Sequence, residues 1–258
     1  MKEISIIIPT KNEELAIAKV ICSIPKKILK KSEIIVADSS NDMTPIIAKR
    51  LGARVIRIKG GKGLAMIKAA KIAKGNILVF LDGDGTDPPE LIPKLLKKLK
   101  KCDIVIASRF KIDKNLKNPI HKMVWYLYIQ FMKSIWKLVG MNFKGDPLAG
   151  FRVLRKETWK KLKLRSKDFL IESEINIKAK MIGLKICEIG IPIYPRIGGL
   201  FSSKLLTNPK QWIKIFSFIS RYIAKEQKNK LKMIKKKFLK RMNKLWKLLK
   251  LKNFLTLI

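Results

Sequence analysis

The first 110 residues alternate short apolar runs with segments of helical spacing, and this alternation constrains the fold more than any other feature. It predicts an α/β fold in which a mostly parallel sheet carries helices on both faces. Asn12 is the expected N-cap of the first helix. The expected strands are Ile4–Ile8, Glu33–Ala37, Arg54–Ile58, Asn76–Leu81 and Asp103–Ala107, and the expected helices are Glu13–Ser23, Thr44–Leu51, a segment from the Gly60–Gly63 loop to Lys74, and Pro88–Lys101.

The second half of the sequence changes character. Residues 119–140 are rich in aromatic side chains, and residues 146–155 form a short polar insert that contains glycine. Asp168–Gly183 has helical spacing, and Lys185–Ile193 has the composition of a strand. No glycine and no further proline follow Pro209, which predicts a wholly helical end. We therefore expect a domain over residues 1–205 and a helical tail over residues 206–258.

The expected tail combines an apolar stripe with many basic residues. Between Lys225 and Lys252 there are 13 Lys or Arg residues and one acid, Glu226. A basic helix with an apolar stripe is typical of a helix that lies at the surface of an anionic membrane. The same pattern also fits a helix that docks on the domain and keeps its basic face in solvent. The apolar residues that share one face are Leu231, Ile234, Phe238, Met242, Leu245 and Leu249.

The formal net charge of +39 leaves three classes of partner open: nucleic acid, an anionic membrane surface and phosphorylated small molecules. No helix-turn-helix, zinc or RRM-like signature accompanies the charge, so nucleic acid is not expected. Lysines interrupt the most apolar long segment, residues 123–139, and no membrane-spanning helix is expected. The three cysteines, Cys22, Cys102 and Cys187, are odd in number and lack metal-binding spacing. They predict reduced thiols rather than disulfides or a zinc site.

Residues 76–89 are the most informative segment for function. An apolar run ends at Leu81 and is followed at once by Asp82 and Asp84, with Gly83 between them. In an extended segment these two carboxylates point the same way, and the glycine lets a bulky ligand approach the backbone. Two such oxygen donors suit Mg²⁺ or Mn²⁺ held together with substrate phosphates. A polar turn after a strand is the alternative interpretation, since Asp-Gly is common in turns.

Polar residues follow the other expected strands as well. Residues 9–13, 38–40 and 108–109 each come directly after an apolar run. Ligands of parallel α/β sheets bind beyond the carboxyl ends of the strands. The polar groups of four strand ends are therefore expected to form one site.

The motifs at these strand ends resemble those of the inverting family-2 glycosyltransferases with a GT-A fold, and more narrowly the dolichyl-phosphate mannose synthase group. The resemblance covers about residues 3–205 and implies that residues 1–205 form a GT-A catalytic domain. It also implies a nucleotide sugar as donor and Mg²⁺ or Mn²⁺ as cofactor. The matching segments, in the family's order, are Ser5–Glu14, Ile34–Thr44, Gly61–Ala70, Ile77–Glu90, Ile104–Phe110, Asp146–Leu154 and Glu172–Gly199, followed by Ser203–Leu205.

The resemblance also implies roles for individual residues at the positions that match the family's motifs. Most of these roles are contacts with parts of a nucleotide sugar. The implied contacts are Pro9, Lys11 and Glu13 with the base; Val36 and Asp38 with base and ribose; Asp82, Gly83 and Asp84 with metal and diphosphate, with Thr86 as a further metal contact; Arg109 with donor and acceptor phosphates; and Arg196 and Lys204 with donor phosphates.

The sequence departs from the family's pattern at three places. Ala37 stands where a second acid is frequent, and Met43 stands where glycine is usual. Leu200 and Phe201 lengthen the segment between Arg196 and Lys204, which leaves the role of Lys204 open.

Several residues have two interpretations each. Asp146 is either a general base for a hydroxyl acceptor or a residue that ties its own turn. Glu172 and Glu174 either bind sugar hydroxyls or belong to a solvated helix turn, and the aromatic residues of 125–136 either pack in the core or face lipid. The remaining expectations are Lys62 as a contact of the donor phosphate, Lys122 as a contact of the acceptor phosphate, and His121 as a structural or surface residue.

These observations lead to one leading hypothesis. The chain transfers a hexose from a GDP- or UDP-linked sugar to a polyprenyl or dolichyl phosphate, as a peripheral enzyme at the cytoplasmic face of the membrane. A lipid monophosphate is largely ionised at pH 7, so its attack needs no general base. The alternatives are a glycosyltransferase that acts on a sugar hydroxyl, a nucleotidyltransferase, and a non-catalytic basic protein that binds membrane or nucleic acid.

Overall fold

The computed structural model describes residues 2–112, 119–197, 208, 210–229 and 232. The chain separates into two compact units, Met1–Ile215 and Phe216–Ile258. The described residues of the second unit, 216–229 and 232, are helical. The expected domain boundary at 205/206 and the predicted apolar stripe from Leu231 to Leu249 lie outside the described residues.

In the described part of the chain, seven strands form one sheet in the order β3-β2-β1-β4-β6-β5-β7. β6 runs antiparallel to both of its neighbours, and all other pairs are parallel. The predicted mostly parallel sheet is confirmed. The strands are β1 (Ile4–Thr10), β2 (Ser32–Asp38), β3 (Arg54–Arg57), β4 (Ile77–Phe80), β5 (Ile104–Ile112), β6 (Arg152–Arg155) and β7 (Ile186–Ile193).

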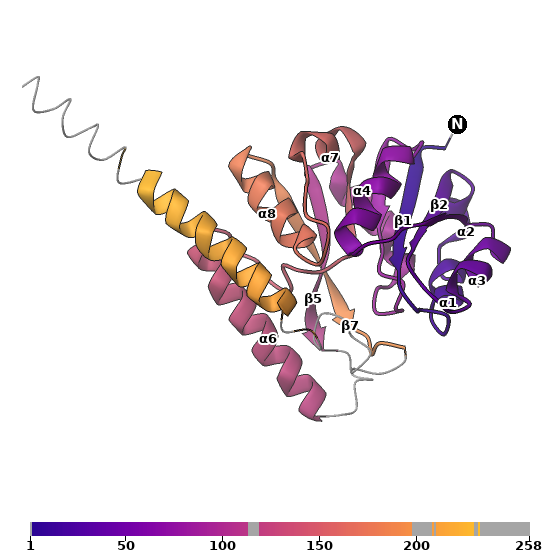
Figure 1. Cartoon of the computed structure of the whole chain (residues 1–258), viewed down its shortest axis with the longest axis horizontal. Coiled ribbons are helices and arrows are strands. Elements are labelled where there is room, and N and C mark those ends of the chain that lie inside the picture. The colour runs from indigo at the N-terminus through magenta and orange to yellow at the C-terminus, as the bar shows by residue number, and fades with distance from the viewer. Residues whose placement is uncertain (1, 113–118, 198–207, 209, 230–231, 233–258) are drawn as a thin grey trace, which may run out of the picture. The chain divides into compact units, whose positions relative to one another are not determined.

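Helices cover both faces of the sheet. Figure 1 shows α1, α2 and α3 on one side of β1 and β2, and α4 on the other. A 3-10 turn, Pro89–Leu91, precedes α5, and α6 follows β5 in the sequence. The helices are α1 (Ile17–Cys22), α2 (Lys26–Leu29), α3 (Thr44–Arg50), α4 (Lys62–Ile72), α5 (Ile92–Leu99), α6 (Pro119–Leu138), α7 (Lys156–Leu162) and α8 (Ile171–Met181).

The pleat of β1 explains why the sheet is buried on both faces. Ile6 and Ile8 belong to the cluster that includes α1 and α5, whereas Ile7 points to the opposite face, and all three are fully buried. On that opposite face the ring of Phe80 lies 4.7 Å from the ring of Trp159 in α7. A strand that is buried on both faces reads as a continuous apolar run, which is why these strands were predictable.

The structure corrects the N-terminal cap of the first helix. α1 begins at Ile17 and has no side-chain cap, so Asn12 does not fill this role. Asn12 instead adopts a positive φ of 53°, and its side-chain oxygen accepts a hydrogen bond from the backbone N–H of Asn41 at 2.9 Å. It therefore joins the loops that follow β1 and β2.

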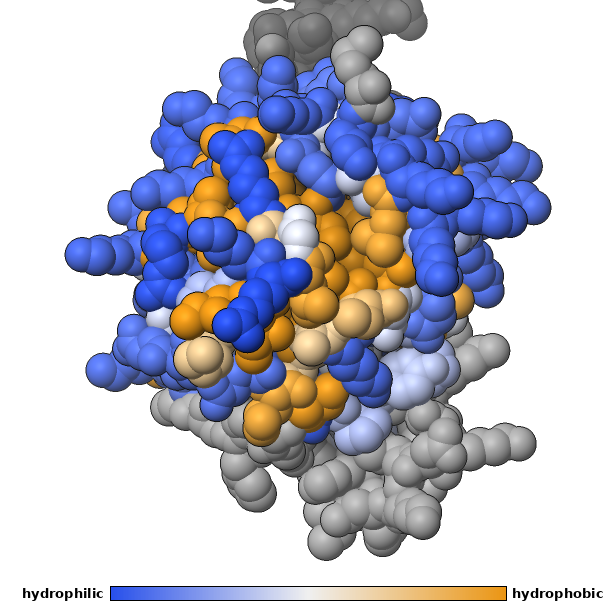
Figure 2. Space-filling view, turned by 90° about the vertical axis from the view of Figure 1, so that its right-hand side faces the viewer, coloured by the Kyte–Doolittle hydropathy of each residue, from blue (hydrophilic) through white to orange (hydrophobic). Residues whose placement is uncertain are grey.

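The surface over α1, α2 and α3 is mainly hydrophilic around a limited apolar area (Figure 2). The most exposed apolar side chains of this region are Leu15, Met43 and Ile46. Across the described ranges, no helix is both long enough and apolar enough to cross a bilayer.

A disulfide joins Cys102, just before β5, to Cys187 in β7. The prediction of reduced thiols is wrong for this pair, whereas Cys22 is free and exposed. The two cysteines are 85 residues apart in the sequence. Only the pairing of β5 with β7 brings them together, so neither their number nor their spacing could reveal the bond.

We expect the disulfide to stabilise the domain substantially. For a loop of this length the chain-entropy model gives about 4.6 kcal/mol, because the cross-link restricts the unfolded chain. The double variant Cys102→Ala, Cys187→Ala should therefore unfold at lower denaturant concentration than the wild type, and reductant should no longer affect it. Cys22→Ala is the matched control and should behave as the wild type does. An unchanged unfolding midpoint of the wild type under strong reductant would contradict the assignment.

Candidate active site

The carboxyl ends of β1, β2, β4 and β5 open onto a cavity of about 990 Å³. The polar residues expected after four strand ends do meet there, with Ser39 as the contribution of the loop after β2, and α4, α6 and α8 add further residues. The predicted site residues that line the cavity are Pro9, Lys11, Glu13, Asp82, Gly83, Asp84, Thr86, Arg109 and Arg196, together with Lys62, Asp146 and Glu172.

Gly83 and Asp84 form a turn that begins directly after Asp82, so the segment from Asp82 to Asp84 is not extended. β4 already ends at Phe80, and Gly85 has a φ of 79°. One oxygen of Asp84 accepts hydrogen bonds from the backbone N–H of Thr86 at 3.0 Å and from its hydroxyl at 2.7 Å. The predicted extended geometry is therefore wrong, although both carboxylates do line the cavity. The turn forms because an aspartate readily bonds the backbone two residues ahead.

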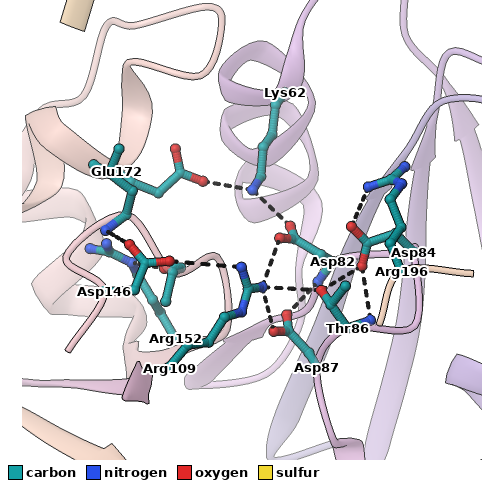
Figure 3. A network of polar contacts seen from close by, with 12 residues as sticks. Lys62, Asp82, Asp84, Thr86, Asp87, Arg109, Asp146, Arg152, Glu172 and Arg196 are labelled. Atoms are coloured by element: carbon teal, nitrogen blue, oxygen red, sulfur yellow. Dashed lines mark hydrogen bonds and ion pairs between the residues drawn. The ribbon is translucent and has the colours of Figure 1, made fainter. Parts of the chain in front are cut away.

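The half-buried carboxylate of Asp82 is the centre of a chain of charged side chains (Figure 3). This carboxylate lies 2.7 Å from the ammonium of Lys62 and 3.8 Å from the guanidinium of Arg109. Lys62 also lies 2.7 Å from Glu172, which joins α4 to α8. Burial by itself lowers the pKa of Lys62, but the charges of Asp82 and Glu172 outweigh it and raise the pKa above its usual value. Lys62 is therefore a fixed cation on the cavity wall.

Asp84 pairs with a different cation. The guanidinium of Arg196, which follows β7, contacts the carboxylate of Asp84 and lies 2.6 Å from that of Glu13. The arginine thus connects the loops after β1, β4 and β7. Both carboxylates of the Asp-Gly-Asp segment are neutralised by basic residues of the chain itself.

Arg109 is held by a residue that the sequence interpretation missed. The buried carboxylate of Asp87 lies 2.9 Å from the Arg109 guanidinium, and its other oxygen accepts from the backbone N–H of Asp82 at 3.0 Å. Burial raises the pKa of Asp87 to about 6, against the opposing charge of Arg109. Asp87 was detectable only as the third carboxylate of the segment that contains Asp82 and Asp84. It fixes the position of Arg109 on the cavity wall.

Asp146 ties its own turn. One of its oxygens accepts hydrogen bonds from the backbone N–H of Leu148 at 2.8 Å and from the hydroxyl of Tyr128 at 2.9 Å. The carboxylate is 2% exposed, and its other oxygen lies 3.7 Å from Arg109. Arg152 supports the same turn from below, donating to the carbonyls of Pro147 and Ala149. This geometry favours the turn interpretation of Asp146 over the general base.

Val36 and Asp38 are buried away from the cavity wall. Val36 belongs to the core, and the carboxylate of Asp38 accepts from Thr10 at 2.8 Å and pairs with Arg57. Their expected direct contact with base and ribose is not supported. Asp38 instead organises its neighbours, because Arg57 does line the cavity.

The two glutamates of α8 have different surroundings. Glu172 points to Lys62 and the cavity, whereas Glu174 accepts from the backbone N–H groups of Arg165 and Ser166 and does not line the cavity. Burial would raise the pKa of Glu174, but these bonds and Lys178 hold it below its usual range. Glu172 therefore remains a candidate ligand contact, and Glu174 stabilises the loop before α8.

Three predicted residues cannot be placed. Lys204 lies outside the described residues. His121 and Lys122 belong to α6, but their side chains lie outside the described part.

The residues present fit a divalent cation that is shared with a substrate. Within the described residues, no group of three or more His, Cys, Asp or Glu side chains could hold a metal by itself. Mg²⁺ is commonly bound by one or two carboxylates plus substrate phosphates, and Asp82, Asp84 and the hydroxyl of Thr86 match that donor set. The remaining ligands would be oxygens of a bound phosphate.

Comparison with known proteins agrees with the site. The model of the family described as Glycosyl transferase family 2 matches residues 5–156. A dolichol-phosphate mannosyltransferase of Pyrococcus furiosus is 33% identical over 193 residues, which are 69% of this chain and 53% of that protein. The chain thus spans about half the length of this relative. A dolichyl-phosphate hexose transferase of Haloferax volcanii is 29% identical over 76% of this chain and 85% of its own length.

Solved structures show the same fold. Glucosyl-3-phosphoglycerate synthase from Mycobacterium tuberculosis, crystallised with Mn²⁺, UDP-glucose and phosphoglyceric acid, has a TM-score of 0.66 at 20% identity. The similarity covers 86% of this chain and 80% of that chain. The architecture described above is therefore the GT-A fold.

Gly150 provides a test of the position of Asp82. A Cβ atom at residue 150 would lie 2.6 Å from both carboxylate oxygens of Asp82, so Gly150→Ala must displace this side chain. A nucleoside diphosphate with Mn²⁺ at 100 times its Kd should stabilise the wild type by about 2.7 kcal/mol. We expect Gly150→Ala to lose most of this stabilisation in a thermal-shift titration.

Gly52→Ala is the matched control. A Cβ atom there meets nothing within 4 Å but takes a φ of 82°, so this variant loses stability through the backbone alone. It should keep the full ligand-induced shift. Equal ligand-induced shifts in Gly150→Ala and the wild type would show that the position of Asp82 does not matter for binding.

Proposed function

Because the chain belongs to glycosyl transferase family 2 and is a glycosyltransferase, we propose that it transfers a hexose from a nucleotide sugar to a polyprenyl phosphate of the dolichyl type, with inversion at the sugar carbon. The names of the Pyrococcus and Haloferax relatives support this acceptor class. The donor is a GDP- or UDP-linked hexose.

One observation carries the choice of acceptor. Each acidic side chain that the structure describes on the cavity wall already has a basic or hydrogen-bonding partner. A hydroxyl acceptor requires a general base, whereas a phosphate monoester is already ionised at pH 7. This supports an acceptor that brings its own nucleophilic oxygen. The pairs are Glu13 and Asp84 with Arg196, Asp82 and Glu172 with Lys62, Asp146 with Tyr128, and Asp168 with Lys214.

The donor side of the proposed mechanism rests on the charged groups around the turn after β4. Asp82 and Asp84, with Thr86, would hold Mg²⁺ or Mn²⁺, which when bound neutralises charge on the leaving diphosphate. Lys62 and Arg196 are cations on the wall of the same cavity and can form charge-assisted bonds to phosphate oxygens. Pro9, Lys11 and Glu13 form the wall at the end of β1 and are proposed to border the nucleotide.

The acceptor side of the proposed mechanism rests on Arg109. This arginine lies between the carboxylates of Asp82 and Asp146, with Asp87 beneath it. An acceptor phosphate bound there would stand close to the donor, and an oxygen of that phosphate would attack the sugar carbon from the side opposite the diphosphate. The nucleoside diphosphate leaves with the electron pair, and no proton has to be removed. Lys122 and Lys204 are proposed as further phosphate contacts.

The cellular setting completes the proposal. A polyprenyl phosphate resides in a membrane, so residues 1–205 are proposed to act at its cytoplasmic surface. Residues 206–258, with their basic composition, are proposed to hold the domain there.

Two substitutions of the same kind test the mechanism. Purified chain is incubated with labelled GDP- and UDP-hexoses, Mn²⁺ and dolichyl phosphate, and organic-soluble label is counted. Asp82→Asn should lower kcat by about 10²–10³, because it weakens the stabilisation of the leaving diphosphate. Asp146→Asn should cost less than about tenfold, since its amide oxygen still accepts from Tyr128 and Leu148, whereas loss of a general base typically costs about 10²–10⁴.

Two results would count against the proposal. Label that enters only water-soluble products, together with a large effect of Asp146→Asn, would identify a hydroxyl acceptor. Undiminished transfer after chelation of divalent ions would remove the proposed cofactor.

A further inference from the structure

Three aromatic rings follow one another along the cavity wall, and the first of them contacts Arg109. The guanidinium of Arg109 lies over the ring of Trp125 at 6.0 Å from its centroid. The ring of Trp125 lies 5.4 Å from that of Tyr128, which in turn lies 5.9 Å from that of Trp212. All three rings line the cavity. We call Trp125, Tyr128 and Trp212 the aromatic wall.

The aromatic wall offers mainly hydrocarbon surface. The hydroxyl of Tyr128 is used by Asp146 at 2.9 Å. Burial raises the pKa of Tyr128 well above its usual value, and the charge of Asp146 adds to this, so the phenol stays protonated and keeps donating. Leu148 lines the same region. A ligand that contacts the aromatic wall would therefore touch the faces and edges of its rings, next to the buried guanidinium of Arg109.

Trp125 and Tyr128 lie on the same side of α6 as its core residues, but nearer the N-terminus of the helix. Ile129, Met132 and Trp136 of this helix are buried in the core, and Met123, Leu127 and Phe131 are each more than half exposed. Unlike those core residues, Trp125 and Tyr128 are only half-buried, and both line the cavity. Core packing does not explain them, because the rings that do pack in the core, such as Trp136, are fully buried.

We propose that the aromatic wall is the binding subsite for the first isoprene units of the acceptor. This inference rests on the proposed function, because it takes the acceptor phosphate to bind at Arg109. A prenyl chain attached to that phosphate has to leave Arg109 along an apolar path, and the wall supplies one within a ring's width of the guanidinium. Aromatic side chains provide large apolar contact areas of fixed shape, which suits a branched, unsaturated chain.

Chain-length dependence of the acceptor tests the proposal. The wild type and Trp212→Ala are assayed in detergent with ethyl phosphate, geranyl phosphate and farnesyl phosphate as acceptors, at saturating nucleotide sugar. The wild type should prefer the prenyl phosphates over ethyl phosphate. In Trp212→Ala the KM for farnesyl phosphate should rise about tenfold, because apolar contact area is lost, and the KM for the nucleotide sugar should stay the same.

Two further variants make the result specific. Phe131→Ala removes an aromatic ring from the exposed face of α6 and should leave every KM at the wild-type value. Trp212→Phe keeps a ring in the wall and should recover most of the preference for prenyl phosphates. Thermal unfolding of each variant shows whether the fold is intact.

The possible failures are distinguishable. If the wild type uses polyprenyl phosphate but Trp212→Ala and Trp125→Leu keep the full preference for longer chains, the subsite assignment is wrong and the proposed function stands. If the wild type itself transfers to no prenyl phosphate, the proposed function fails, and the subsite with it. A rise in the KM for the nucleotide sugar alone would place these rings on the donor side and overturn the assignment.

Discussion

The ion pairs of the half-buried Asp82 carboxylate are the interactions on which the site depends. Lys62 of α4 and Arg109 of β5 approach this carboxylate, and Gly150 leaves it just enough room. Removing charges from water is costly unless each charge meets an opposite one, so the three groups hold one another in place. Through Lys62 the carboxylate also fixes Glu172 of α8. Segments that are far apart in the sequence thus meet at the two carboxylate oxygens of Asp82.

The charge of the cavity differs from that of the whole chain. The chain carries +39, yet the described residues of the cavity wall include equal numbers of acids and bases. A nucleoside diphosphate adds negative charge that this balance does not offset, which supports the proposed divalent cofactor. The acids are Glu13, Asp82, Asp84, Asp146, Asp168 and Glu172, and the bases are Lys11, Arg57, Lys59, Lys62, Arg109 and Arg196.

The parallel strands and their terminal motifs were predictable because their signals are local. The apolar run of β4 and the acidic turn that follows it, for example, are both recognised from neighbouring residues in the sequence. β6 was missed, since four residues within a polar insert carry too weak a pattern. The disulfide and the role of Asp87 were missed for another reason. Each depends on which segments the sheet brings together, and Asp87 acts on Arg109, which lies 22 residues further along the chain.

The contrast between local sequence signals and contacts that form only in the fold also separates the two halves of the cavity. The proposed donor side is built from strand ends whose motifs are contiguous, so their residue types alone suggest phosphate and metal chemistry. The proposed acceptor side is built from α6, the turn of Asp146, and residues 208, 211 and 212, which no short motif connects. There Asp146 looks like a base in isolation and becomes a structural ligand of Tyr128 only in the fold. The hydrogen bond from Tyr128 to Asp146 occupies both the candidate base and the tyrosine hydroxyl, so the ring of Tyr128 offers the cavity mainly apolar surface. Both effects favour an acceptor that is an anion with a hydrocarbon chain.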